Sequence, residues 1–357
     1  MPVVNTELLS VKNKLRDAIR VLELSHSRIA IVVNRGMKLE GVITDGDVRR
    51  GILNGRTLDD DLETIMNREP LIAHVHFTRD QLRDVLTKHA IEAIPVVDKL
   101  GNFLKVVHLS ELVDETHVGT HWKCSALVIM AGGEGKRLRP LTNTTPKPML
   151  EINGVSVLER LVRSAVKSQV NKIYIATNYK SDQISSHFGD GSRFGVDIRY
   201  LREDVKLGTA GALSLLDEIT ELPVLVVNGD VLTTSSYQRI LSFHFEQCAE
   251  VTVGVVQHVV QIPYGVVQIK NDLVQSVTEK PSQTFLCNAG IYVISAKVLR
   301  SIPKNQYLDM PDLIQMSLAR SDAVCAFPIH EYWTDIGTKK DLEEARKKIA
   351  SLEGSDE

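Results

Sequence analysis

Three glycines and four cations lie close together in the middle of the chain, and residues of these types suit the binding of phosphate. Gly132, Gly133 and Gly135 follow an apolar run that predicts a buried strand over residues 126–130. Because glycine has no side chain, the backbone there can approach a phosphate and direct its N–H groups at it. The positive charges are Lys136, Arg137, Arg139 and Lys147. Together these residues predict a cradle for a polyphosphate.

Two familiar phosphate loops do not match this stretch. A P-loop requires GxxxxGK followed by serine or threonine, but Gly135-Lys136 is followed by arginine and the position of the first glycine holds Met130. A dinucleotide fingerprint requires GxGxxG, but the residue three positions after Gly135 is Leu138. An ordinary glycine turn after a strand is therefore the alternative interpretation.

A proline on each side of Lys147 fixes the backbone around a single cation, which favours the phosphate interpretation. The stretch from Ala126 to Leu150 resembles the signature of the sugar-1-phosphate nucleotidyltransferases, also called nucleotide-sugar pyrophosphorylases. The pattern GGxGxRLxPLTxxxPKPML is matched at Gly132, Gly133, Gly135, Arg137, Leu138, Pro140, Leu141, Thr142 and Pro146 to Leu150. The resemblance implies that Arg137 and the glycines hold a nucleoside triphosphate and that Lys147 contacts phosphate.

The length and composition of the chain limit the classes of protein to which it can belong. A chain of 357 residues suggests about two domains, and 43% hydrophobic residues are enough for substantial cores. The net charge of −3 and the lack of a long basic run indicate no nucleic-acid partner. No apolar run approaches the roughly 20 residues that span a bilayer and no secretory signal is present, so we expect a cytoplasmic protein with no membrane partner. The four cysteines lack metal or redox spacing and are expected to be buried, reduced thiols.

Residues 1–118 contain an internal repeat. Leu15-Arg16-Asp17 recurs as Leu82-Arg83-Asp84, and Val42-Ile43 recurs as Val106-Val107. Each copy predicts a helix, a short strand, a turn, a short strand and a second helix. The repeat resembles a tandem pair of cystathionine-β-synthase-type (CBS) domains. Such pairs commonly associate in twos, so the resemblance also implies a homodimer.

The segment from Gly41 to Asp47 resembles the part of a CBS domain that binds ribose phosphate. The resemblance implies that Thr44 and Asp47 bind an adenine nucleotide as a regulatory ligand. In the second copy the aligned residues are His108 and Glu111, so at most one such site is expected. The alternative is a module that only assembles and packs the protein and leaves its cleft unused.

After a linker over residues 119–123, strand-like and helix-like segments alternate through residues 124–357. Strands are expected at residues 126–130, 172–177, 198–201 and 223–227, and apolar spacings of three and four predict a helix over residues 157–167. This alternation predicts an α/β fold with a doubly wound, mixed and mostly parallel sheet, whose ligands bind at the carboxyl ends of the strands. We therefore expect a nucleotidyltransferase domain over residues 124–357.

Two aspartates directly follow apolar segments and are candidate metal ligands. Asp230 follows the run from Val224 to Val227, and Asp335 follows Trp333-Thr334. Mg²⁺ typically takes one or two protein carboxylates together with phosphate oxygens and waters. A turn aspartate is the alternative for Asp230. Both positions match the magnesium aspartates of the family, so the resemblance implies Mg²⁺ as the cofactor.

Small residues from Leu207 to Leu213 begin a predicted helix, where a flat base or a phosphate can approach the backbone. The family has such a segment at its base pocket, which implies that Gly208 and Thr209 bind the nucleotide. A polar residue stands upstream of that segment in the family, and Glu203 is the candidate here. Tight packing of the helix on the sheet is the alternative.

Three short motifs further on match the sugar side of the family. They are Tyr264-Gly265, Glu279-Lys280-Pro281 and Asn288-Ala289-Gly290. The resemblance implies that Lys280 binds the sugar phosphate and that Gly265, Glu279 and Asn288 bind the sugar. Each motif alone is more typical of a turn.

The implied reaction joins a nucleoside triphosphate and a sugar 1-phosphate into a nucleotide sugar and releases pyrophosphate. Because the second pKa of a phosphate monoester is about 6, the attacking phosphate is largely dianionic and needs no general base. A CBS pair joined to this transferase resembles the guanylyltransferases that act on glucosamine 1-phosphate in bacterial legionaminic acid synthesis, so GTP and glucosamine 1-phosphate are the first expectation. The alternatives are mannose-1-phosphate guanylyltransferase, glucose-1-phosphate thymidylyltransferase or uridylyltransferase, and a catalytically dead nucleotide-sensing protein.

Overall fold

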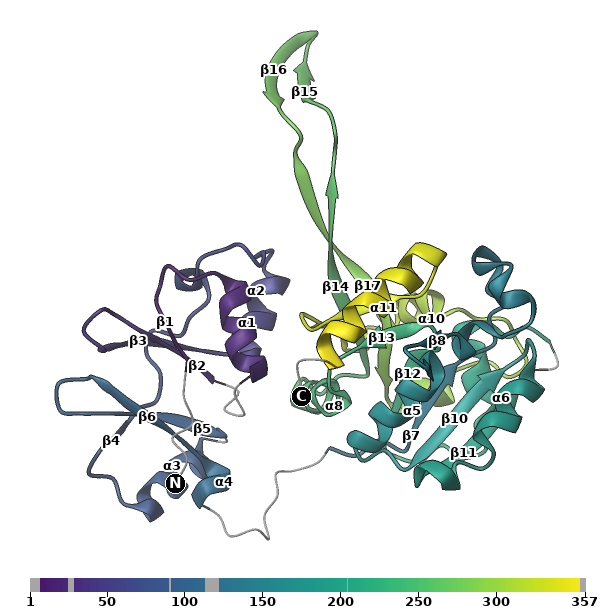
Figure 1. Ribbon diagram of the computed structural model, residues 1–357, viewed down its shortest axis with the longest axis horizontal. Helices are drawn as coiled ribbons and strands as arrows, with labels where there is room; N and C mark the ends of the chain where they lie inside the picture. The colour runs from purple at the N-terminus through teal and green to yellow at the C-terminus, as the bar shows by residue number, and fades with distance from the viewer. Residues whose placement is uncertain (1–6, 25–28, 90, 113–121, 204, 354–357) are drawn as a thin grey trace. The chain divides into compact units, whose positions relative to one another are not determined.

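The computed structural model describes residues 7–24, 29–89, 91–112, 122–203 and 205–353 (Figure 1). The chain divides into two compact units, Met1–Thr120 and His121–Glu357, and each unit is described by itself. Most of the expected linker over residues 119–123 lies outside the described residues.

The N-terminal unit consists of two copies of one motif. The first copy contains β1 (Leu8–Leu9), α1 (Leu15–Leu24), β2 (Ile29–Val33), β3 (Leu39–Thr44) and α2 (Asp45–Leu53). The second contains β4 (Ala73–His74), α3 (Arg79–Lys88), β5 (Ala93–Val97), β6 (Phe103–His108) and α4 (Leu109–Leu112), and the short helix η1 (Leu62–Thr64) stands between them. Each copy forms a three-stranded sheet of the same order, β1-β2-β3 and β4-β5-β6. The repeat expected from the sequence is thus present in the backbone.

The C-terminal unit is built on a seven-stranded sheet of order β11-β10-β7-β12-β17-β14-β18. Its strands are β7 (Ala126–Met130), β10 (Lys172–Thr177), β11 (Asp197–Arg202), β12 (Val224–Asn228), β14 (Val251–Gln261), β17 (Ser282–Ile294) and β18 (Val324–Pro328). The first four are parallel, whereas β17 runs antiparallel to both of its neighbours. This is the mixed, mostly parallel α/β sheet that the sequence predicts.

Helices cover both faces of this sheet, which explains why its central strands are apolar throughout. One face packs on α5 (Val157–Lys167), α6 (Ser181–Phe188) and α8 (Tyr237–Glu246). The other packs on α7 (Gly208–Gly211), η6 (Ala212–Leu215), α9 (Ala296–Arg300) and α10 (Met310–Ala319). The hydroxyl of Ser156 caps α5 by accepting the N–H of Glu159, which fixes where that helix begins.

The remaining elements of this unit are short, apart from the last helix. They are η2 (Lys136–Leu138), η3 (Leu141–Asn143), η4 (Lys147–Met149), β8 (Glu151–Ile152), β9 (Val155–Ser156), η5 (Ser192–Phe194), β13 (Val231–Thr233), β19 (Trp333–Asp335) and α11 (Lys339–Glu353). None of the described helices is long and apolar enough to cross a bilayer. The expectation of buried thiols is wrong for Cys248 and Cys287, which are exposed, while Cys124 and Cys325 are only partly buried. All four cysteines are free thiols.

Two strands of the sheet continue beyond it as a two-stranded ribbon. β14 and β17 stay paired from Val255 with Asn288 to Gln261 with Ser282, and a hairpin of β15 (Val266–Lys270) and β16 (Leu273–Thr278) forms the tip. We call residues 258–286 the arm. Figure 1 shows the arm leaving the sheet as a narrow green projection.

Candidate active site

A cavity of about 430 Å³ lies at the carboxyl ends of β7 and β12, where a doubly wound sheet is expected to bind its ligand. Nine residues selected from the sequence line it: Gly132, Gly133, Gly135, Arg137, Lys147, Glu203, Gly208, Thr209 and Asp230. The structure therefore brings the predicted phosphate loop, base pocket and first metal aspartate together.

The glycine loop after β7 makes a tight turn at Gly135 and leaves its backbone open at Gly133. Gly135 has a φ of +62°, and a Cβ there would lie 2.8 Å from Cγ2 of Thr142, so glycine is required on both counts. The hydroxyl of Thr142 holds the turn by donating to the carbonyl of Gly135 at 2.8 Å. A Cβ on Gly133 would meet no atom within 4 Å, so this part of the loop faces open space. The backbone can thus come close to a ligand at Gly133.

The cations of the cavity include one that is fixed by a carboxylate. Lys147 begins η4 directly after Pro146, which is extended, and its ammonium donates to Asp230. The Lys147 side chain is 12% exposed, so its charge is largely shielded from water. Arg137 lies in the adjacent short helix, and its Nη1 is 3.5 Å from the position that a Cβ on Gly337 would occupy. This arrangement concentrates positive charge at the glycine loop.

The two aspartates selected as metal ligands lie at a pair of neighbouring strands, Asp230 directly before β13 and Asp335 at the end of β19. β13 pairs with β19 so that Val231 stands opposite Asp335, and the N–H of Ile336 donates to the carbonyl of Asp230 at 2.9 Å. Asp335 is exposed and does not line the cavity itself, although Gly337 does. Two nearby carboxylates with open space beside a phosphate loop are a donor set that suits Mg²⁺.

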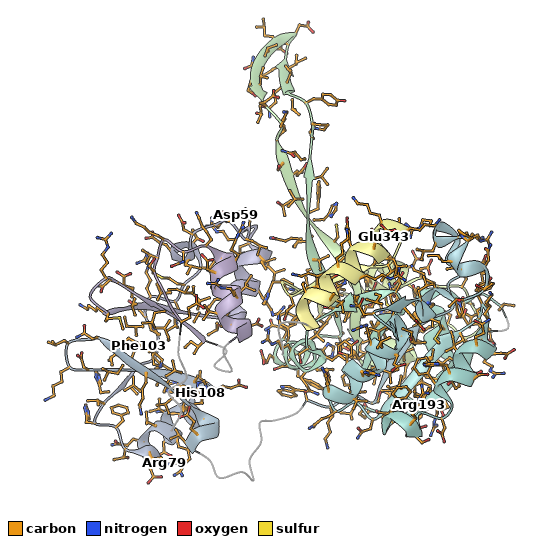
Figure 2. The ribbon with its side chains drawn as sticks, in the orientation of Figure 1. Asp59, Arg79, Phe103, His108, Arg193 and Glu343 are labelled. Atoms are coloured by element: carbon orange, nitrogen blue, oxygen red, sulfur yellow. The ribbon has the colours of Figure 1, made fainter. Side chains whose placement is uncertain are left out.

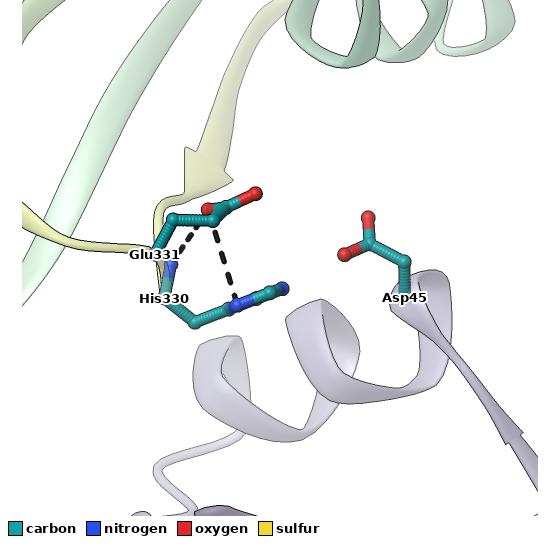
Figure 3. A group of neighbouring side chains, drawn as sticks. All are labelled: Asp45, His330 and Glu331. Carbon is teal, nitrogen blue, oxygen red and sulfur yellow. Dashed lines mark hydrogen bonds and ion pairs between the residues drawn. The ribbon is translucent and has the colours of Figure 1, made fainter. Parts of the chain in front are cut away.

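Among the residues that the structure describes, neither unit by itself brings together three histidine, cysteine, aspartate or glutamate side chains that could form a metal site. Glu331, just before β19, accepts a hydrogen bond from the N–H of His330 at 3.2 Å (Figure 3). It also accepts one from Arg239 at 3.1 Å. Asp45, also drawn there, belongs to the N-terminal unit and accepts a hydrogen bond from Arg49 at 2.6 Å. These carboxylates thus have protein partners of their own.

Glu203 and the α7 segment form the side of the cavity assigned to the base. The Glu203 carboxylate accepts the N–H of Leu207 at 2.8 Å, which fixes its orientation and leaves capacity for further donors. Gly208 has a φ of +78°, and a Cβ there would lie 2.5 Å from the carbonyl oxygen of Leu308. Packing against Leu308 therefore requires glycine at position 208. Close approach of the backbone to a ligand would require glycine there as well.

Thr209 is tied to the loop before α10. Its N–H donates to Asp309 at 3.0 Å, and its hydroxyl accepts the N–H of Met310 at 2.8 Å. Hydrogen bonds from the Tyr307 hydroxyl and from Thr209 lower the pKa of the Asp309 carboxyl below its usual range. Asp309 thus remains charged and holds the two sides of the pocket together.

The sugar side is only partly assembled. Asn288 lines a second hollow of about 370 Å³, which shares Thr209, Asn228 and Asp309 with the cavity. The amide oxygen of Asn288 accepts the N–H of Gly290 at 2.9 Å. A Cβ on Gly290 would lie 2.6 Å from Nδ2 of Asn228, so this turn also requires glycine.

Three residues predicted for the sugar lie on the arm and not in the cavity. Gly265, Glu279 and Lys280 are all exposed. Gly265 and Glu279 are neighbours, since a Cβ on Gly265 would lie 3.0 Å from Oε2 of Glu279. The structure thus keeps these motifs together but separates them from Asn288, because β14 and β17 remain paired between the two places.

Several cavity residues were not predicted from the sequence. They are Asn178, Lys206, Asn228, Tyr307 and Asp309. Asn178 and Asn228 stand at or just after the ends of β10 and β12, so the rule that selected Asp230 could have found them. Tyr307 and Asp309 enter from a loop about a hundred residues further along the chain, and no local spacing indicates that approach.

The two residues proposed for a regulatory nucleotide lie at the start of α2. Thr44 caps the helix by accepting the N–H of Asp47, and the Asp47 carboxylate accepts the N–H of Thr44 at 2.8 Å. Arg50 also pairs with Asp47. This reciprocal arrangement is a capping box, so both side chains contribute to the helix itself.

Comparisons with known proteins show which families the two parts of the chain match. The family model for nucleotidyl transferase matches residues 126–351, and the CBS domain model matches residues 3–54 and 62–117. A mannose-1-phosphate guanylyltransferase of Mycobacterium tuberculosis is 32% identical over 221 residues, which are 60% of this chain and 62% of that protein. The mannose-1-phosphate guanylyltransferase catalytic subunit beta of Danio rerio is 32% identical over 224 residues, with the same shares of 60% and 62%.

A crystal structure named as a glucose-1-phosphate thymidylyltransferase of Bacillus anthracis has a TM-score of 0.51 and 25% identity, and covers 62% of this chain and 94% of its own. The chain spans less than two thirds of the length of the two guanylyltransferases, 62% of each. The family match itself extends over most of the C-terminal unit. The chain belongs to the nucleotidyl transferase family, and its N-terminal part carries a pair of CBS domains.

Proposed function

We propose that the protein is a sugar-1-phosphate guanylyltransferase, which makes a GDP-sugar and pyrophosphate from GTP and a sugar 1-phosphate. The observation that carries this proposal is the cavity in which Arg137 and Lys147 stand beside the glycine loop and Asp230. Such a site offers charge neutralisation and geometry, which are the two contributions that phosphoryl-type transfers need.

In the proposed reaction, a phosphate oxygen of the sugar 1-phosphate attacks the α-phosphorus of the nucleotide. The bond from that phosphorus to the new oxygen forms while the bond to the bridging oxygen of the β-phosphate breaks, and pyrophosphate leaves. Because the attacking phosphate is already largely dianionic at neutral pH, no side chain has to remove a proton. Arg137 and Lys147 would stabilise the charge that accumulates on the leaving group.

Asp230 and Asp335 fit Mg²⁺ as ligands, since the ion takes one or two carboxylates and completes its shell with phosphate oxygens and water. When bound, Mg²⁺ would orient the triphosphate and neutralise part of its charge. Lys147 would then share Asp230 with the ion, and its ammonium would lie near the phosphates.

Two observations support guanine as the base. Glu203 lines the cavity, and one carboxylate can accept both the N1–H and the N2–H of guanine. Uracil and thymine offer one ring N–H between two carbonyls, which a carboxylate would repel. The two relatives described above are named as guanylyltransferases.

For the sugar we propose glucosamine 1-phosphate, on the resemblance of the CBS–transferase arrangement to the enzymes of legionaminic acid synthesis. Mannose 1-phosphate is the second candidate, because it is in the names of the relatives. We further propose a homodimer that acts in the cytoplasm, a reducing compartment in which four unpaired cysteines are expected.

The test is a measurement of pyrophosphate release for four nucleoside triphosphates combined with glucosamine 1-phosphate, mannose 1-phosphate and glucose 1-phosphate. We expect GTP with glucosamine 1-phosphate to give the highest kcat/KM. A maximum with UTP or dTTP would contradict the guanine assignment and leave the reaction class standing. Release with none of the pairs would instead support the catalytically dead nucleotide-sensing protein.

A further inference from the structure

The arm is unusual because it carries many large apolar side chains and is exposed along nearly its whole length. It carries eleven of the large apolar side chains that are exposed in the described residues: Val259, Val260, Ile262, Tyr264, Val267, Ile269, Leu273, Val274, Val277, Phe285 and Leu286. All other exposed large apolar residues together number fourteen and are scattered over the rest of the described chain. Such a concentration on one element indicates a surface that is covered in the working protein.

The two-stranded ribbon is too small to be stable by itself in water. A two-stranded hairpin is marginal in water at best, and the tip places Val267 directly opposite Val277 with exposures of 46% and 63%. Figure 2 shows the side chains of the arm projecting freely on both sides of the ribbon. Long, exposed apolar strands are also sites of uncontrolled pairing unless another surface covers them.

The arm carries three of the residues that the family resemblance assigns to the sugar side of the site. Glu279 and Lys280 follow β16, and Gly265 precedes β15, so all three lie where the ribbon meets its tip. Lys280 and Asn288 are eight positions apart in the chain, which corresponds to roughly 26 Å along an extended strand. Lys280 therefore lies far from the sugar side of its own chain.

The pairing of the ribbon opposes a return of the arm to its own cavity. Seven consecutive pairs join β14 to β17 from Val255–Asn288 to Gln261–Ser282, and the only irregularity recorded between these strands lies nearer the sheet, between Val253 and Val255. A sharp bend of the ribbon toward its own cavity would break part of this ladder. A straight ribbon therefore keeps Lys280 away from the cavity of its own chain.

We propose that the arm completes the active site of a second copy of this chain, with Lys280 and Glu279 as its contribution, in a dimer whose two arms are exchanged. This rests on the proposed function. A second copy is the partner that possesses the cavity for which these residues are suited, and a two-fold axis satisfies both arms at once. The arm carries only Lys270, Asp272, Glu279 and Lys280 as charged residues, which sum to zero and favour apolar self-association over an electrostatic partner.

The test combines two inactive chains. Asp230→Asn damages the cavity and Lys280→Ala damages the arm, and each homodimer should release little pyrophosphate. The two chains are co-expressed with different tags, and the mixed dimer is isolated. With exchanged arms, one of its two sites has an intact cavity and an intact arm, so we expect about half of the wild-type turnover per dimer. A mixed dimer as inactive as its parents would overturn the proposal.

Controls separate this inference from the proposed function. Lys270→Ala removes the other lysine of the arm and should leave activity unchanged. Full activity of the Lys280→Ala homodimer would overturn the inference, while wild-type pyrophosphate release would still support the reaction. If Asp230→Asn does not fold, Arg137→Ala replaces it as the cavity variant, and circular dichroism checks both.

Amide hydrogen exchange measures whether the arm is covered by another surface and needs no substrate. It therefore tests the inference even if the wild type has no activity. The amides of residues 266–278 should exchange much more slowly than those of an unsupported hairpin, and Val267→Asp with Val277→Asp should make them fast. Fast exchange throughout the arm of the wild type, or the mass of a single chain in solution, would overturn the inference.

Discussion

At the residue scale, the cavity is lined by several charged side chains. No histidine, cysteine or serine is among the described residues that line it. Four cationic residues line it: Lys136, Arg137, Lys147 and Lys206. Lys206 is fixed by Glu134 at 2.8 Å, and this ion pair lowers the pKa of Glu134 and raises that of Lys206. The site is therefore suited to a reaction whose nucleophile arrives already charged.

The first prediction concerns the two candidate metal ligands. Asp230→Asn and Asp335→Asn should each lower turnover by about two orders of magnitude or more, because a lost ligand weakens the stabilisation of charge in the transition state. Turnover is measured across a Mg²⁺ titration, together with the thermal midpoint. Asp182→Asn, on an exposed position of α6, is the matched control and should change neither quantity. Normal turnover of either variant at every Mg²⁺ concentration would remove that residue from the site.

The second prediction concerns the choice of base. Glu203→Gln should reduce the preference for GTP over UTP by about 1–3 kcal/mol, the usual cost of an imperfectly paired buried polar contact. The measurement is the ratio of kcat/KM for the two nucleotides. Glu343→Gln, on the exposed side of α11, is the control and should keep the wild-type ratio. An unchanged ratio in Glu203→Gln would mean that another group reads the base.

At the element scale, the sequence predicted the parallel strands and the site at their ends, because both depend on local signals. The continuous apolar runs of β7 and β12 indicate strands buried on two faces, and the residues that follow such runs must lie at one edge of the sheet. The arm was not predicted, since its alternating residues resemble those of an ordinary half-buried strand. Whether an apolar strand is covered depends on tertiary and quaternary contacts that local spacing does not encode.

The third prediction concerns the junction of α8 with β14, where His244 is buried. Its Nδ1 lies 2.9 Å from the hydroxyl of Thr252, and burial lowers the pKa of His244 to about 4. In the unfolded chain this pKa returns to about 6.5, so the unfolded state binds the additional proton between these values. The stability of the C-terminal unit should therefore fall by about 2–3 kcal/mol as the pH decreases from about 6.5 to 4.

Denaturant unfolding followed by tryptophan fluorescence measures this unit alone, because Trp122 and Trp333 both belong to it. His244→Gln, which does not titrate, should remove most of the pH dependence over this range. His258→Gln, at an exposed position of the same unit, should keep it. Equal pH dependence in wild type and His244→Gln would show that other groups cause the acid sensitivity.

At the scale of the whole molecule, two units with different tasks share one chain. The transferase unit contains the cavity, and the N-terminal unit contains the repeat with one intact Thr–Asp pair. The capping box complicates any test of that pair, because removing Asp47 also weakens α2 by about 1 kcal/mol. Asp47→Asn keeps a side-chain acceptor at the cap, and Ser156→Ala removes a helix cap in the other unit. Together they separate loss of stability from loss of ligand binding.

The last prediction is that AMP or ATP binds through Thr44 and Asp47 and changes the activity of the transferase. Calorimetry should detect binding to the wild type, and Asp47→Ala should weaken it by roughly 1–3 kcal/mol, since an acceptor for the ribose hydroxyls is lost. Ser156→Ala should bind as the wild type does. Binding alone does not establish regulation, because the nucleotide must have different affinities for two states of the enzyme. Turnover and KM are therefore measured with and without each nucleotide. Absence of binding would reduce the N-terminal unit to an assembly module, and binding without any kinetic change would retain the site but contradict the coupling.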